Sequence, residues 1–254
     1  PLNTIIGTVV ATDPDPGDAL TFSIVSDSPS FQINAATGVL SVKQVAPLNF
    51  EQRENFDVEV QAQDDGEGTL RGSAIIRINI NDVNEKPTLA AGFAREIDEN
   101  VLGGTAVPGD AITGTDVDAG QTLAYSIAGC EPVSECTGNP FVIDRVTGVL
   151  SVGASAKLNF ERQELYKLTV RATDSDVADP LFSETSVSIS VKNINDAPIA
   201  GITNLRVGED TDKGTILGSV AVSDEDAGET HTFKIGLNNC WRFVVTKPSP
   251  NWYH

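Results

Sequence analysis

Methionine is absent from the 254-residue sequence, and cysteine, aromatic residues and positive charge are scarce. The missing methionine indicates an excised or processed segment rather than a complete translation product. Only 17 lysines and arginines face 36 aspartates and glutamates, which gives a net charge of −19. Nucleic acid and anionic membranes bind clusters of basic residues, so this balance argues against both as partners. No apolar run reaches the roughly 18 residues that span a bilayer, and no secretory signal pattern is present.

The three cysteines also limit the chemistry that the chain supports. Cys130 and Cys136 lie in one loop-like stretch, where the spacing is equally compatible with a local disulfide and with two free thiols. No Cys-x-x-Cys pair or Cys/His cluster supports a zinc site. Cys240 is expected to be unpaired or to bond outside the segment. The 40% hydrophobic content is enough for packed cores and argues against global disorder.

The sequence repeats itself at intervals of about 100 residues. An Asp-x-Asp-x-Gly motif occurs at residues 13–17, 116–120 and 224–228, so its copies are 103 and then 108 residues apart. Four further motifs recur in the same order, at residues 31–33 and 141–143, 37–42 and 147–152, 48–51 and 158–161, and 62–64 and 172–174. We therefore predict three repeats, at residues 1–88, 89–199 and 200–254.

The first and third predicted repeats are incomplete. The Glu-bearing strand that opens the second repeat has no counterpart in the first, so we expect it upstream of residue 1. The third repeat continues for about half a repeat length. Its tail either contains the counterpart of residues 141–143 at 243–245 or is foreign sequence. Between the first two repeats the offset grows from 103 to 110 around Cys130–Cys136, which indicates an insertion of about seven residues.

Alternation of apolar and polar residues predicts strands. Period-two segments rich in β-branched residues occur at 56–62, 74–80, 168–172 and 187–191. Thr37-Gly38 and Thr147-Gly148 are expected to form hairpin turns, where glycine accepts a positive φ. No helix-length amphipathic stretch is present. An all-β fold of Greek-key β-sandwiches follows from this pattern.

The acidic residues are concentrated in the repeated motifs. Fifteen of the 36 occupy repeat-matched positions, and the remaining 21 nearly balance the 17 bases. Clustered like charges destabilise a folded surface unless a cation binds them, and Ca²⁺ prefers such oxygen ligands. An EF-hand is rejected because its loop needs a glutamate at the twelfth position, where this sequence has Ile24, Ile127 and Ile235. Acid pairs that recur at each repeat also argue against a glycosidase, and the two histidines offer little for a catalytic triad, so we predict no enzyme.

The motif set resembles extracellular cadherin repeats. The shared order is Glu-Asn, Ala-x-Asp-x-Asp-x-Gly, Phe-x-Ile with Thr-Gly-Val-Leu, Leu-x-x-Glu, Ala-x-Asp, and Asp-x-Asn-Asp/Glu before a proline, and it covers almost the whole chain up to about residue 240. The resemblance implies seven-stranded Ig-like sandwiches arranged end to end, with up to three Ca²⁺ at each junction.

The resemblance also implies a ligand set. At the first junction it consists of Glu51, Asp82, Asn84, Glu85, the carbonyls of Val83 and Lys86, and then Asp116, Asp118 and Asp174. At the second it consists of Glu99, Glu161, Asn193, Asn195, Asp196, Asp224 and Asp226. Asp13, Asp15 and Asp64 would form half of a site that awaits a preceding repeat, and Glu209 would await a following one. Asn49 and Asn159 stand where the family usually has an acid, which puts the outermost ion in doubt.

The function implied is calcium-dependent adhesion. Bound Ca²⁺ would rigidify a rod in the extracellular part of a membrane protein, and the partners would be other cadherin-like chains, like or unlike. The membrane would be reached only through an anchor elsewhere in the parent. A carbohydrate- or matrix-binding module and a passive spacer remain alternatives.

Overall fold

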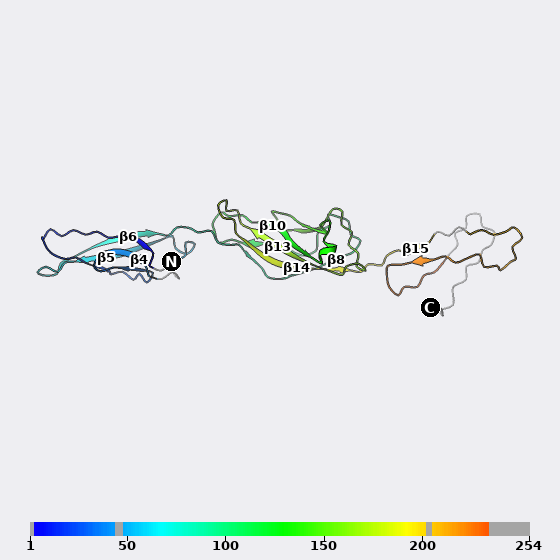
Figure 1. Cartoon of the computed structure of the whole chain (residues 1–254), viewed down its shortest axis with the longest axis horizontal. Helices are drawn as coiled ribbons and strands as arrows, with labels where there is room; N and C mark the ends of the chain where they lie inside the picture. The colour runs from blue at the N-terminus through cyan, green and yellow to red at the C-terminus, as the bar shows by residue number, and fades with distance from the viewer. Residues whose placement is uncertain (1–2, 44–47, 202–204, 234–254) are drawn as a thin grey trace. The chain divides into compact units, whose positions relative to one another are not determined.

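The computed structural model describes residues 3–43, 48–201 and 205–233. These residues form β-strands, turns and one short 3₁₀ helix, η1 (Val133–Glu135). They contain no helix long and apolar enough to cross a membrane. The chain divides into two compact units: unit 1 contains Pro1–Thr88, Gly114–Leu123 and Thr173–Ser183, and unit 2 contains Leu89–Thr113, Ala124–Ala172 and Glu184–His254. Figure 1 colours the chain by residue number and labels strands of both units.

Two three-stranded sheets build unit 1. One has the order β1-β4-β3 and the other the order β2-β5-β6, with all pairs antiparallel. Their bounds are β1 Ile5–Thr8, β2 Thr21–Ile24, β3 Phe31–Ile33, β4 Val39–Val42, β5 Asn55–Gln63 and β6 Arg71–Asn79. The long strands β5 and β6 lead into residues 64–66 and 80–86, which carry several of the predicted ligands.

Unit 2 is built on a four-stranded sheet with the order β10-β13-β14-β8. Its strands are β8 Phe93–Asp98, β10 Ala124–Glu131, β13 Leu165–Thr173 and β14 Phe182–Lys192. Strands β11 (Phe141–Ile143) and β12 (Leu150–Val152) pair with each other, as do β15 (Ile199–Ala200) and β16 (Val222–Ser223). The remaining strands are β7 (Thr88–Leu89) and β9 (Gly114–Thr115), of which β9 belongs to unit 1. The all-β prediction is confirmed for the described residues.

The predicted alternation places every second side chain of most of β13 and β14 in a core, whereas in β6 only Ile78 is buried and Ala74 is exposed. Along β13, Leu168 and Val170 are almost fully buried and pack with Val187 and Ile189 of β14. The core of unit 1 repeats this arrangement around Val58 of β5. Edge-to-face aromatic pairs also recur, with ring centroids 5.3 Å apart for Phe31–Phe56 and 5.2 Å apart for Phe141–Tyr166. These four aromatic residues therefore pack in the interior, whereas Phe182 and Phe233 are exposed.

The two predicted hairpin turns are confirmed. The amides of Gly38 and Gly148 each donate to a carbonyl four residues earlier, at 2.9 Å, and both glycines have a positive φ. Ile24 lies in β2 and Ile127 in β10, so these two positions cannot complete an EF-hand loop. Ile235, Cys240 and residues 243–245 lie outside the described residues.

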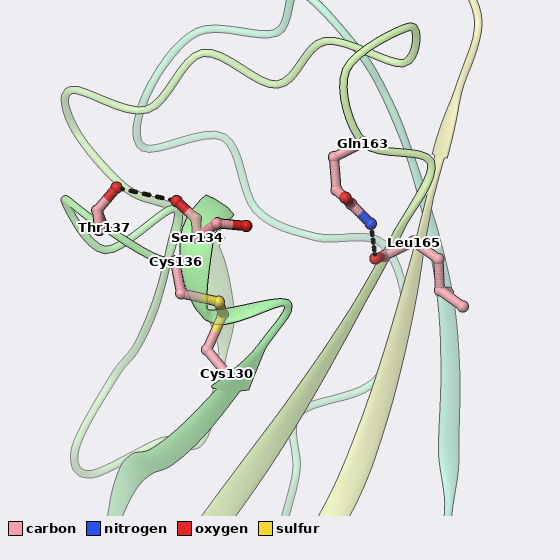
Figure 2. Close-up of a disulfide and its surroundings, with 6 residues drawn as sticks. All are labelled: Cys130, Ser134, Cys136, Thr137, Gln163 and Leu165. Atoms are coloured by element: carbon pink, nitrogen blue, oxygen red, sulfur yellow. Dashed lines mark hydrogen bonds between the residues drawn. A yellow bond between two sulfur atoms is a disulfide. The ribbon is translucent and has the colours of Figure 1, made fainter.

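A disulfide joins Cys130 at the end of β10 to Cys136 beside η1 (Figure 2). It closes the inserted stretch, in which the hydroxyl of Thr137 also donates to the carbonyl of Ser134 at 3.2 Å. The structure thus selects the disulfide over the free thiols.

Candidate metal centres

Each Asp-x-Asp-x-Gly motif folds into a loop that its own first aspartate closes. In the second repeat the amide of Asp118 donates to Oδ1 of Asp116 at 3.1 Å, and the loops at 13–17 and 224–228 contain the same bond at 2.9 and 3.1 Å. Gly120 has a φ of 82°, a left-handed conformation that disfavours side chains, which explains the glycine of the motif. The loop uses one oxygen of its first carboxylate and leaves the second for another partner.

Four carboxylates gather in unit 1 beside the loop of the second repeat. Oxygens within 4.8 Å of one another come from Glu51, Asp82, Glu85 and Asp118. Desolvation raises the pKa of Glu85 above its ordinary value, and the charge of Glu51 and the neighbouring Asp118 and Asp82 raise it further. Desolvation is the larger cause of the raised pKa, and the part that comes from repulsion among the carboxylates is what a bound cation would remove.

Two buried oxygens of this loop have no hydrogen-bond partner within the described part of the chain: Oδ2 of Asp116 and Oδ1 of Asp118. Asp118 is only 7% exposed, so bulk water has little access to it. Leaving a charged, buried oxygen unsatisfied is costly, whereas coordination to a metal ion would satisfy it. Carboxylate oxygens are hard ligands, of which Ca²⁺ takes about six to eight, so the residues present fit this ion.

The segment after β6 contacts two loops of the second repeat within unit 1. The amide of Glu85 donates to Oδ2 of Asp118 at 3.0 Å. The side-chain amide of Asn84 donates to Oδ2 of Asp174 at 3.0 Å and to the carbonyl of Asp179 at 2.8 Å. Asp174 is 5% exposed. Backbone and side-chain hydrogen bonds thus hold the predicted ligands of the first junction in one place.

A second cluster lies in unit 2, where oxygens within 4.8 Å of one another come from Glu99, Glu161 and Asp196. Parallel pairing of β8 with β14 ends at Asp98, and this register places Glu99 beside the segment that follows β14. Glu99 is 2% exposed and accepts hydrogen bonds from the amides of Phe160 at 2.8 Å and Ile194 at 2.7 Å. The backbone of two separate segments therefore fixes this carboxylate.

Asp196 connects this cluster to the loop of the third repeat, because its amide donates to Oδ2 of Asp226. Desolvation and nearby carboxylates raise the pKa of Asp196, although a hydrogen bond from Asn100 opposes the shift. Oδ2 of Asp224 is buried and has no hydrogen-bond partner among the described residues. Nε2 of His231 lies 3.6 Å from this oxygen, which is beyond hydrogen-bond distance. This loop also presents an unsatisfied oxygen to a cation.

Several predicted ligands lie outside these clusters. Asp64 accepts hydrogen bonds from the amides of Gly66 and Leu70 in its own loop, and the acid that gathers with Asp13 and Asp15 is Asp18. The side chains of Val83 and Lys86 are exposed, as expected for residues predicted to act through their carbonyls.

The asparagines at the second junction make hydrogen bonds with its acids. Asn193 donates to Oε1 of Glu161 at 2.8 Å, and Asn195 donates to the carbonyl of Asp196 at 3.1 Å. Although a backbone hydrogen bond lowers the pKa of Glu161, desolvation and neighbouring carboxylates raise it overall. The side chain of Asn159 closes its own turn by accepting from the amide of Arg162 at 2.7 Å.

Sequence reasoning missed the residue that follows the glycine of each loop. Asp18 gathers with Asp13 and Asp15, and Glu229 gathers with Asp224 and Asp226, in both cases with oxygens within 4.8 Å. The signal was present, because these positions are in register in all three repeats. It went unnoticed because the residue type varies, with Gln121 in the second repeat.

The Cadherin domain family matches residues 1–81 and 93–192, well over half of the chain. Human Protocadherin Fat 1 is 28% identical over 232 residues, covering 86% of this chain and 5% of its own length. Human Cadherin EGF LAG seven-pass G-type receptor 3 is 31% identical over 258 residues, covering 96% of this chain and 7% of its own length. Human Cadherin-12 is 30% identical over 240 residues, covering 87% and 29%. The chain thus spans less than a third of each relative.

Solved structures show the same fold. Mouse Cadherin-23 EC22-24 has a TM-score of 0.58 and 28% identity, covering 76% of this chain and 60% of its own. Human Protocadherin-24 EC1-2 has a TM-score of 0.63 over 76% of this chain and 90% of its own, and at 21% identity this likeness bears on the fold alone. The predicted tandem β-sandwich fold is confirmed.

Proposed function

The chain belongs to the cadherin family, and from this premise we propose that it is a calcium-binding segment of an adhesion ectodomain. Cadherin repeats are typically calcium-binding and non-enzymatic. The observation that carries the proposal is the set of buried, unpartnered carboxylate oxygens on Asp116, Asp118 and Asp224. Each lies in an Asp-x-Asp loop beside further acids, where a divalent cation would supply the missing partner.

Two sets of residues would hold the ions. In unit 1 these are Glu51, Asp82, Glu85, Asp116, Asp118 and Asp174, with Asn84 as a neutral member. In unit 2 they are Glu99, Glu161, Asp196, Asp224 and Asp226, with Asn193 and Asn195. Bound Ca²⁺ supplies positive charge that removes the repulsion among these acids. Because each set draws on two consecutive repeats, the ions would restrict the motion of one repeat against the next.

An extracellular location fits the chain's chemistry. Disulfides persist in oxidising environments such as the cell exterior, and the chain contains one between Cys130 and Cys136. Relatives include seven-pass receptors, and solved relatives carry extracellular cadherin domains. We propose that the parent is a surface protein and that its partners are cadherin-like chains. A solved Protocadherin gammaB7 EC3-6 forms a cis-dimer, which makes a second copy the first partner to test.

Calcium titration into the chelator-treated protein tests the metal proposal. We expect the melting temperature to rise as Ca²⁺ reaches about 10⁻⁴–10⁻³ M, the range in which extracellular modules bind. At about ten times Kd, each ion would add about 1.4 kcal/mol to the free energy of unfolding. An unchanged melting temperature up to 10 mM, roughly ten times the upper end of that range, would contradict the proposal. Bead aggregation with and without calcium then separates adhesion from a passive spacer.

A further inference from the structure

The residue after the glycine of each Asp-x-Asp-x-Gly loop changes its charge along the chain. It is Asp18 in the first repeat, Gln121 in the second and Glu229 in the third. These positions are 103 and 108 residues apart, the same separations as the loops themselves. The fold thus presents three versions of one position, two carboxylates and one amide, beside otherwise equivalent aspartates.

In the second repeat the side chain of Gln121 ties three segments of unit 1 together. Its Nε2 donates to Oδ2 of Asp118 at 3.3 Å and also to Oδ1 of Asn84. Its Oε1 accepts from the amide of Ser175 at 3.1 Å. The amide group therefore faces the loop aspartate and the segment after β6 with its hydrogen-bond donors.

In the other two loops the same position carries a carboxylate, Asp18 or Glu229, in place of the amide of Gln121. The carboxylate of Glu229 lies with those of Asp224 and Asp226, and the side chain of Asp224 is only 5% exposed. Oδ2 of Asp224 has no hydrogen-bond partner among the described residues, which points independently to a missing cation.

We propose that this position sets the calcium affinity of each loop. A carboxylate, as in Glu229, serves as a further ligand, whereas Gln121 weakens its site because its amide donates to oxygens that a cation would need. The NH₂ group of Gln121 occupies Oδ2 of Asp118 and Oδ1 of Asn84, so a cation would have to displace it to use these two oxygens, whereas Oδ1 of Asp118 stays open. The number of charged ligands is a principal determinant of calcium affinity in proteins. This inference rests on the proposed calcium binding, and it assigns the difference in strength between loops to one residue.

The test exchanges the amide and the carboxylate at this position in two of the loops. We expect Gln121→Glu to lower the calcium Kd of one site by at least about threefold, since it adds a ligand charge and removes the competing donors. Without calcium the same variant should melt at a lower temperature than the wild type, because the added carboxylate repels its neighbours. Glu229→Gln should raise the Kd of a different site by a similar factor. Because this variant removes a repulsive charge, it also serves if Gln121→Glu does not fold.

The control is Gln32→Glu in β3, which adds the same charge 89 residues before Gln121 and outside all three loops. Calorimetric titration in about 150 mM salt, where the Debye length is about 8 Å, suppresses non-specific attraction of Ca²⁺ to the acidic surface. The proposal is overturned if both exchanges leave every Kd unchanged, or if Gln32→Glu lowers Kd as much as Gln121→Glu. A wild-type chain that binds no calcium would sink the proposed function itself. Calcium binding that is indifferent to residues 121 and 229 would sink this inference alone.

Discussion

The guanidinium of Arg162 lies 2.6 Å from the carboxylate of Glu135, which connects the disulfide-bonded insertion to the turn that carries Glu161. Arg162 is the direct neighbour of this candidate ligand, yet its charge pairs with η1. Glu161 accepts instead from the neutral Asn193 at 2.8 Å. The insertion thus pairs with the guanidinium of Arg162, and Glu161, a candidate ligand, keeps a neutral partner. The pair is largely exposed on the Arg162 side, so its own contribution to stability is at most about 1 kcal/mol.

We expect the double change Cys130→Ser, Cys136→Ser to lower the free energy of unfolding by about 2 kcal/mol. The chain-entropy model gives this value for a loop of about seven residues. Urea unfolding followed by circular dichroism measures it. Dithiothreitol should shift the wild-type midpoint to that of the variant and leave the variant unchanged. Equal midpoints for wild type and variant would show that the bond does not stabilise the fold.

The fold was largely predictable because its signals are local and repeated. Alternation located β5, β6, β13 and β14, and a second copy of each motif turned weak signals into firm ones. The disulfide was not predictable, because spacing alone does not show that the chain turns back through η1 between the two cysteines. Only the three-dimensional arrangement places Cys130 and Cys136 at bonding distance.

The sequence predicted which acids form the candidate site better than it predicted their hydrogen-bond partners. The clustering of Glu51 with Asp118 depends on loops 67 residues apart, and the family resemblance supplied that link. Asp64 shows the limit, because its carboxylate accepts bonds from its own loop and does not gather with Asp13. Gln121 was not predictable for another reason: its side chain carries no charge, so it does not stand out among the recurring acids.

Asp118→Asn should change stability in opposite directions with and without calcium. In the chelator-treated protein it removes a buried charge whose Oδ1 has no partner, so we expect stability to rise by about 1 kcal/mol. With calcium it removes a ligand, so most of the calcium-dependent rise at that site should be lost. Asp57→Asn is the matched control, because Asp57 pairs with Arg77 at 2.8 Å, away from the clusters. If both variants respond equally to calcium, Asp118 is not a ligand.

The calcium-free protein should become more stable as the pH is lowered from neutral, which is the opposite of the usual effect of acid. The pKa of Glu85 is raised above its ordinary 4.5 by desolvation, then by Glu51, Asp118 and Asp82. The folded state therefore binds a proton more tightly than the unfolded state, and stability increases as pH falls through the raised pKa. The gain should level off below 4.5, where the unfolded chain is protonated too. Melting temperatures between pH 7 and about 4.5, the reference pKa range of a glutamate, measure it.

Glu85→Gln is the control for this effect, since it should remove part of the increase on acidification. In saturating calcium the trend should reverse, because protons compete with the ion for the same oxygens. If the melting temperature of the calcium-free protein instead falls steadily as the pH is lowered over this range, the acids of unit 1 do not repel one another in the folded state.

Gly148→Ala should destabilise the chain by more than about 2 kcal/mol, because two costs combine there. Gly148 has a φ of 70°, and an added Cβ would lie 2.1 Å from the carbonyl oxygen of the buried Ile112. Gly104 has a φ of 88°, but an added Cβ would meet nothing within 4 Å. Gly104→Ala should therefore cost only the backbone strain, about 1 kcal/mol. Urea midpoints of the two variants separate the terms, and equal losses would mean that the hairpin turn shifts readily away from Ile112.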